Sequence, residues 1–160
     1  MNFDFSVSNI NTENIGASYY LIGLINRFNN SFQAAADNIF EELSWKQIFF
    51  MNGVALFENA PTIRDMADLL GCSHQNAKQI LSKLEKQRFV EVYQDSTDKR
   101  KQRIMLTEKA VEFRRYYDEP SEQAMQSIFE NISKDELRTT ISVFTRLNKN
   151  VDERKGRMEL

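Results

Sequence analysis

The chain has 160 residues, about the length of one domain, and its 41% hydrophobic and 28% charged content is that of an ordinary globular protein. A single cysteine, Cys72, excludes an intramolecular disulfide, and one cysteine with one histidine supplies too few ligands for a structural zinc site. The longest strictly apolar run, Ile48–Met51, is far shorter than the ~20 residues of a membrane helix, and residues 1–10 lack the basic and apolar regions of a secretory signal. We therefore expect a cytoplasmic protein without membrane contact, metal or cofactor.

The formal net charge of −2 hides an uneven distribution. Residues 73–103 contain eight basic and four acidic side chains, a local charge of +4, so the other 129 residues carry −6. Positive charge concentrated in about a fifth of a chain is typical of a nucleic-acid-binding surface, whatever the total charge.

The first part of the chain predicts two helices. Residues 14–36 carry apolar side chains at helical spacing, in a stripe wider than one neighbouring element would cover. Residues 37–43 are expected to form a connector. Ser44 with Gln47 three residues later is a capping box, which opens the second helix, and Asn59-Ala60-Pro61 breaks that helix.

The middle of the chain predicts two short helices and a hairpin. Thr62 caps the first helix, Gly71-Cys72 forms a turn, and Ser73 caps a helix that runs to about Gln87. The hydrophobic period then changes from 3.6 to 2. Residues 89–93 and 103–106 predict two strands, joined by a polar, charged tip over residues 94–101.

The last part of the chain predicts two more helices. Thr107 caps a helical stretch to about residue 131, which Pro120 must kink or interrupt. A second capping box, Ser133 with Glu136, opens the final helix, and residues 152–160 are expected to fray. This helix carries a narrow heptad seam. Together with the stripe of the first helix, the seam exceeds what a compact domain can cover and predicts a homodimer interface; its residues are Leu137, Ile141, Phe144, Leu147 and Val151.

Two short helices, a tight turn and a hairpin, in this order, indicate a winged helix-turn-helix. A polar helix face alone is explained equally well by solvent exposure, and a basic tip alone is more often a solvated loop. Their combination is much more specific, because the helix side chains suit base edges and phosphates and an arginine at the tip suits a minor groove. The predicted DNA contacts are Thr62, Ser73, His74, Gln75, Asn76, Lys78, Gln79, Lys99, Arg100 and Lys101.

Over nearly its whole length the chain resembles the multiple-antibiotic-resistance regulator (MarR) family of bacterial transcription factors. The matching residues lie in 62–73, 75–79 and 84–86, at Asp95, in the motif Asp98-Lys99-Arg100, and in 106–109. The resemblance implies a mainly α fold with a small β-hairpin wing. It implies a single domain over residues 1–160, in which a winged helix-turn-helix core (44–107) is flanked by dimerisation helices (14–36 and 108–152). It further implies that Asp98 braces the wing, that Arg100 reaches the minor groove and that the helix from Ser73 enters the major groove.

The chain departs from the family pattern at three places. Ala110 stands where the family usually has glycine, Arg88-Phe89 replaces the usual glycine followed by leucine or phenylalanine, and Lys99 replaces a frequent arginine. None of these changes removes a predicted base or phosphate contact. They bear on the local geometry of the hairpin rather than on the fold.

These observations predict a sequence-specific transcriptional regulator, expected to be a repressor, that binds a near-palindromic operator in double-stranded DNA as a homodimer. The two recognition helices would then lie about 34–36 Å apart. The alternative is a winged-helix module for protein–protein contact that has lost DNA binding. An enzyme is disfavoured, because no nucleophile–base set, paired carboxylates or phosphate-cradling glycine loop is present in the sequence.

The resemblance also implies a small aromatic effector, because ligands in this family often bind between the dimerisation helices and the winged domain. Candidate pocket residues are Tyr19, Tyr20, Trp45, Phe49 and Arg64, with Phe28 as a further candidate. The competing interpretation is that these aromatic side chains simply belong to the core. Cys72, without a second cysteine, is more typical of a buried packing residue than of a redox switch.

Overall fold

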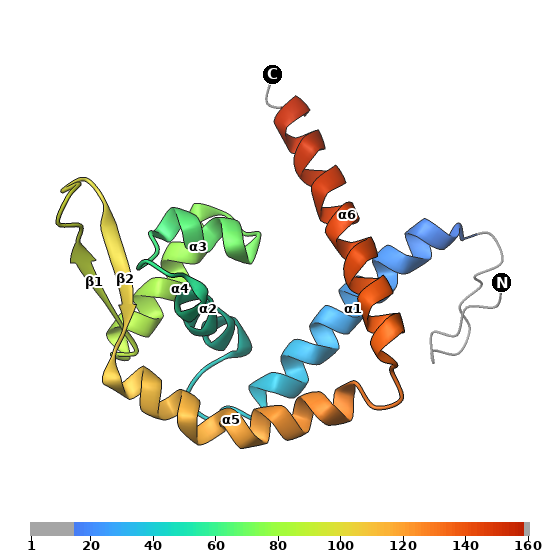
Figure 1. Cartoon of the computed structure of the whole chain (residues 1–160), viewed down its shortest axis with the longest axis horizontal. Helices are drawn as coiled ribbons and strands as arrows, with labels where there is room; N and C mark the ends of the chain where they lie inside the picture. The colour runs from blue at the N-terminus through green and yellow to red at the C-terminus, as the bar shows by residue number, and fades with distance from the viewer. Residues whose placement is uncertain (1–14, 159–160) are drawn as a thin grey trace. The chain divides into compact units, whose positions relative to one another are not determined.

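A computed structural model describes residues 15–158, which form a mainly helical fold with one two-stranded antiparallel hairpin (Figure 1). The elements follow in the order α1 (Ala17–Asp37), α2 (Trp45–Leu56), α3 (Ile63–Leu70), α4 (His74–Lys86), β1 (Val90–Gln94), β2 (Gln102–Leu106), α5 (Glu108–Ile128) and α6 (Lys134–Met158). The predicted fold class and element order are confirmed. After Asp118 the chain divides into two compact units, so that α5 begins in the first and ends in the second.

The helix starts follow the capping signals of the sequence. The backbone N–H of Ser44 donates to Gln47 Oε1 at 3.0 Å, and that of Ser133 donates to Glu136 Oε2 at 2.9 Å. Thr62 and Asp65 form a third capping box, in which the Thr62 N–H donates to Asp65 Oδ2 at 2.8 Å. Each pair satisfies backbone donors that a helix leaves unpaired in its first turn.

The turn between α3 and α4 depends on glycine. Gly71 has φ +62°, in the left-handed region that side chains rarely adopt. The N–H groups of Gly71 and Cys72 return to the carbonyls of Asp68 and Ala67, which closes the end of α3. Ser73 Oγ then accepts from the N–H of Asn76 at 3.2 Å and starts α4. The helix-turn-helix is therefore formed by local sequence signals.

The hairpin β1–β2, called the wing below, is fixed to the helices along one face. Val90 pairs with Leu106 and Val92 with Ile104, and Val90 and Ile104 are fully buried. Beyond this ladder, the Ile104 N–H donates to the Pro61 carbonyl at 2.9 Å. Strand β2 is therefore bonded to the segment that leads directly into α3.

The core of the first unit is rich in aromatic rings. Phe113 lies 5.2 Å from Phe89 and 4.6 Å from Tyr117, and Phe40 lies 5.1 Å from Tyr117, between ring centroids. Phe40 and Leu43 belong to the connector between α1 and α2, yet both are buried. The sequence predicted this connector but not that it anchors the core.

Two helix ends and one interruption differ from the predictions. Helix α5 ends at Ile128 rather than near residue 131, and it is not interrupted at Pro120. Proline removes one N–H donor, and because Pro120 is exposed, water can satisfy the carbonyl left without a partner. Helix α6 continues to Met158, so the expected fraying from residue 152 is wrong over 152–158. Glu153 pairs with Lys149 at 3.9 Å, one helical turn earlier, which favours helix in this stretch.

Candidate nucleic-acid interface

Helix α4 separates buried from polar side chains. Ala77 and Leu84 are fully buried on one side. At 3.6 residues per turn, Gln75, Lys78 and Gln79 lie on the opposite side, with His74 and Asn76 flanking them, and all five are exposed. The structure thus gathers the predicted contacts of this helix on one outward face.

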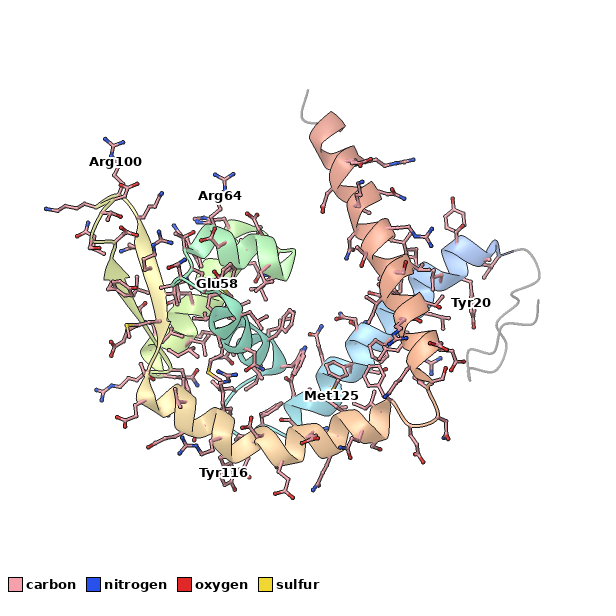
Figure 2. The ribbon with its side chains drawn as sticks, in the orientation of Figure 1. Tyr20, Glu58, Arg64, Arg100, Tyr116 and Met125 are labelled. Carbon is pink, nitrogen blue, oxygen red and sulfur yellow. The ribbon has the colours of Figure 1, made fainter. Side chains whose placement is uncertain are left out.

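The wing tip carries three exposed cations. Arg100, labelled in Figure 2, projects from the tip away from the body of the first unit. Lys99 and Lys101 flank it in the sequence. Asp98 Oδ1 accepts from the Arg100 N–H at 3.1 Å, and Asp98 Oδ2 lies 3.5 Å from Lys101 Nζ. Asp98 therefore lies beside the arginine that was assigned to the minor groove.

Asp95 has more contacts in the wing than Asp98, and sequence reasoning did not single it out for this. Its Oδ1 accepts from the N–H groups of Thr97 and Asp98, at 2.8 and 2.9 Å, and from the Thr97 hydroxyl. Its Oδ2 accepts from Arg103 Nε at 2.6 Å. The Thr97 and Asp98 hydrogen bonds and the Arg103 guanidinium hold the pKa of Asp95 well below its usual range. An aspartate two residues before a threonine in a turn is the sequence signal that indicates this arrangement.

Arg103 is a structural residue of the wing. Besides Asp95 it donates through Nη1 to the Ala60 carbonyl at 3.0 Å, across to the segment before α3. Hydrogen bonding to Asp95 raises the pKa of the guanidinium, which stays charged. Arg103 is one of the basic residues counted in 73–103, but its charge is already paired.

Two of the predicted DNA contacts, Thr62 and Ser73, already form hydrogen bonds as helix caps. The Thr62 hydroxyl donates to Asp65 Oδ2 at 2.8 Å. The Thr62 N–H first, and this hydroxyl second, lower the pKa of Asp65. Ser73 Oγ accepts from Asn76, so its own proton remains available. While its capping box is intact, Thr62 has no hydroxyl proton for DNA.

The effector candidates are only partly brought together. Trp45 and Phe49 stack with centroids 6.0 Å apart, and Phe32, with Phe28 behind it, packs edge-on against Trp45 at 4.8 Å. Tyr20 lies three helical turns before Phe32 on α1, about 18 Å away along the helix axis. Figure 2 shows Arg64 far from Tyr20, on the side of the wing. Tyr19 is 80% exposed. The structure therefore supports an aromatic cluster of Phe28, Phe32, Trp45 and Phe49, without Tyr19, Tyr20 or Arg64.

The heptad seam of α6 is open to solvent in the isolated chain. Ile141 is 57% and Val151 51% exposed, and Leu137 is also exposed. Phe144 and Leu147 are half-buried. In the first unit, α1 likewise exposes Ile22 and Phe28. Both predicted dimerisation helices therefore present apolar side chains.

The described part of the chain has neither a cluster of metal ligands nor a helix that could span a membrane. Across residues 15–158 no three histidine, cysteine or acidic side chains gather as a metal site. Over the same residues no helix has the length and apolar character needed to cross a bilayer. Cys72 is a free, half-buried thiol packed against the core.

Solved structures share this fold, although no protein-family model matches the chain and no curated protein matches it by sequence. A MarR/EmrR family transcriptional regulator from Acinetobacter sp. ADP1 aligns with TM-score 0.77 and 18% identity over 87% of this chain and 99% of its own.

Two further matches are informative. The Staphylococcus aureus regulator MepR, in a structure with DNA, aligns with TM-score 0.72 and 19% identity over 85% of this chain and 98% of its own. PcaV, a transcriptional regulator from Streptomyces coelicolor in complex with its natural ligand, aligns with TM-score 0.71 and 14% identity over 89% and 98%. The chain has the winged-helix fold of the MarR-type regulators, as the sequence resemblance implied.

Proposed function

We propose that this protein is a sequence-specific DNA-binding transcriptional regulator that acts as a repressor. The observation that carries the proposal is the outward face of α4, where exposed hydrogen-bonding side chains lie opposite a fully buried face, next to a wing with Arg100 at its tip. A helix of this kind suits the major groove, and an arginine-tipped wing suits the minor groove beside it. MepR, which has the same fold, is known in complex with DNA. DNA as the partner implies action in the cytoplasm.

The proposed assembly is a homodimer on a near-palindromic operator. The apolar seam of α6 and the exposed apolar residues of α1 are the support, because contiguous apolar surface on a small protein marks an interface. A symmetric dimer has two α4 helices related by a two-fold axis. To contact both, the DNA must contain two inverted half-sites about one turn apart.

A small aromatic effector is part of the proposal. PcaV, a regulator of the same fold, binds a natural ligand. In this chain the cluster of Phe28, Phe32, Trp45 and Phe49 joins α1 to α2, and two of its members, Phe28 and Phe49, remain about half exposed. A ligand that releases DNA must bind the DNA-free geometry more tightly, and a tenfold loss of operator affinity needs about 1.4 kcal/mol of such preference. Titration of aromatic carboxylic acids, followed by Trp45 fluorescence with and without DNA, tests it.

A module for protein contact is the second candidate. It would not need exposed cations at the wing tip, whereas Lys99, Arg100 and Lys101 are all exposed here.

The proposed function is tested by genome-wide capture of bound DNA, followed by gel-shift titration of a captured site. Arg100→Ala is expected to weaken binding and to lower the dependence of log affinity on log salt by about 0.9 for each lost phosphate contact. Unchanged binding by a folded Arg100→Ala protein would remove the wing from the interface.

A further inference from the structure

Arg64 is an exposed cation whose side chain has no ion-pair or hydrogen-bond partner among the described residues. It lies in the first turn of α3. By contrast, Arg103 nearby is held by Asp95 and by the Ala60 carbonyl. An arginine whose guanidinium has no intramolecular partner can serve a ligand without cost to the fold.

A backbone hydrogen bond links the start of α3 to the wing. The bond from the Ile104 N–H to the Pro61 carbonyl joins β2 to the segment before α3, three residues from Arg64 along one chain direction and three from Lys101 along the other. Besides the Thr62 hydrogen bonds, the charges of Arg103 and Lys101 lower the pKa of Asp65, the residue next to Arg64. In Figure 2, Arg64 and Arg100 project to the same side of the first unit.

The acidic side chains of this region leave Arg64 uncompensated. Asp65 faces its cap partner Thr62 through two hydrogen bonds. Asp68 lies one helical turn further along α3, in the weaker order for a pair of opposite charges, and no ion pair joins it to Arg64. Glu58 is exposed and likewise forms no ion pair with Arg64.

We propose that Arg64 binds a DNA phosphate and extends the DNA-contacting surface from the wing to the start of α3. This inference rests on the proposed function and moves Arg64 from the effector site to the nucleic-acid interface. A guanidinium offers two parallel N–H donors to phosphate oxygens. The contact is independent of base sequence, so it positions the protein on the duplex while the α4 side chains distinguish the bases.

The test compares full-length wild type, Arg64→Ala, Arg64→Lys and the control Arg115→Ala on a captured operator and on a scrambled duplex of the same length. Arg115 is an exposed arginine on α5, which lies on the side of the first unit away from the wing tip (Figure 1). Titrations at several salt concentrations give both the affinity and the slope of log affinity against log salt.

Arg64→Ala is expected to weaken binding by the same factor on both duplexes and to lower the salt slope by about 0.9 per protomer. Arg64→Lys should keep the slope, because it keeps the charge, and Arg115→Ala should match wild type. If wild type binds DNA but Arg64→Ala has the wild-type slope and affinity, this inference alone is wrong. A loss confined to the operator would also overturn it, because it would make Arg64 a base contact. If wild type binds neither duplex, the proposed function fails as well.

Discussion

Arg88 adopts a backbone conformation that suits glycine. Its φ is +62°, and it ends α4 in a motif in which the Arg88 N–H returns to the Glu85 carbonyl and the Phe89 N–H to the Leu84 carbonyl, both at 2.9 Å. Arg88 stands where the resembled family usually has glycine. The structure supplies the reason for that preference, since a side chain in the left-handed region costs roughly 1–2 kcal/mol.

Arg88→Gly should therefore raise the free energy of unfolding, by up to about 1 kcal/mol once the greater freedom of glycine in the unfolded chain is included. Urea denaturation followed by circular dichroism measures this change. Gly71→Ala is the matched reverse, because Gly71 has the same φ of +62° with open space around it, and it should lower the urea midpoint. A lower midpoint for Arg88→Gly would contradict the assignment of strain to this position.

Asp95 makes wing stability depend on pH. Because its folded pKa is depressed by the Thr97 and Asp98 hydrogen bonds and by Arg103, its contribution is present above the unfolded value of about 3.9 and is lost as pH falls towards the folded value. Asp95→Asn should be less stable than wild type at pH 7, and the difference should shrink as pH falls below about 4. Thermal unfolding over this pH range measures it, with Asp68→Asn as an exposed control. A difference that is constant with pH would show that the charge of Asp95 contributes nothing.

At the scale of elements, a buried glutamine joins the start of α2 to the end of α4. Gln47, which is 8% exposed, accepts from the Ser44 N–H and donates through Nε2 to Gln87 Oε1 at 2.8 Å. Gln87 in turn donates to the Glu42 carbonyl at 3.3 Å, and Lys109 Nζ pairs with the Glu42 carboxylate at 3.1 Å. Helix α4 is thus linked at its C-terminal end to the connector and to α5.

The free-energy costs of removing the two partners of this pair should not add. Gln87→Leu leaves the buried amide of Gln47 without its acceptor, at a cost of about 1–3 kcal/mol, and Gln47→Leu also removes a capping contact. The double variant Gln47→Leu/Gln87→Leu should be less destabilised than the sum of the two single variants, which a double-mutant cycle in urea measures. Additive losses would mean that the two amides do not interact.

Elements whose signals are local were predictable from the sequence, and those whose position depends on packing were not. Capping residues Ser44, Thr62 and Ser133 placed helix starts within a residue or so. The burial of Phe40 within a connector depends on contacts with Phe113 and Tyr117, more than 70 residues later in the chain, which no local pattern reveals.

The same distinction applies to the candidate site. Helical periodicity identified the outward face of α4, and the wing cations followed from composition. The engagement of Arg103 by Asp95 and Ala60, and the absence of such partners for Arg64, are tertiary facts. The sequence alone did not distinguish these two arginines, because Arg103 counted only as one basic residue of 73–103 and Arg64 was a candidate for the effector pocket.

At the scale of the whole molecule, the proposed dimer makes a direct prediction. Leu147→Asp places a charge in the α6 seam, and desolvating that charge at an interface is unfavourable. Sedimentation at micromolar concentration should show wild type as a dimer and Leu147→Asp shifted to monomer. Asn148→Asp, one residue away and outside the seam, adds the same charge and should remain a dimer. A wild-type monomer, or no difference between the two variants, would exclude the seam as the interface.

We propose above all that the α4 helices of two protomers, related by symmetry, recognise the base sequence of the operator. The most direct measurement is selection of duplexes from a random pool by the purified full-length protein, with the mass of the selected complex determined afterwards. We expect two inverted half-sites with centres about 10–10.5 base pairs apart, two protomers on each duplex, and loss of the sequence preference in Gln75→Ala/Gln79→Ala. Recovery of no common sequence, or of a single half-site bound by one protomer, would contradict it.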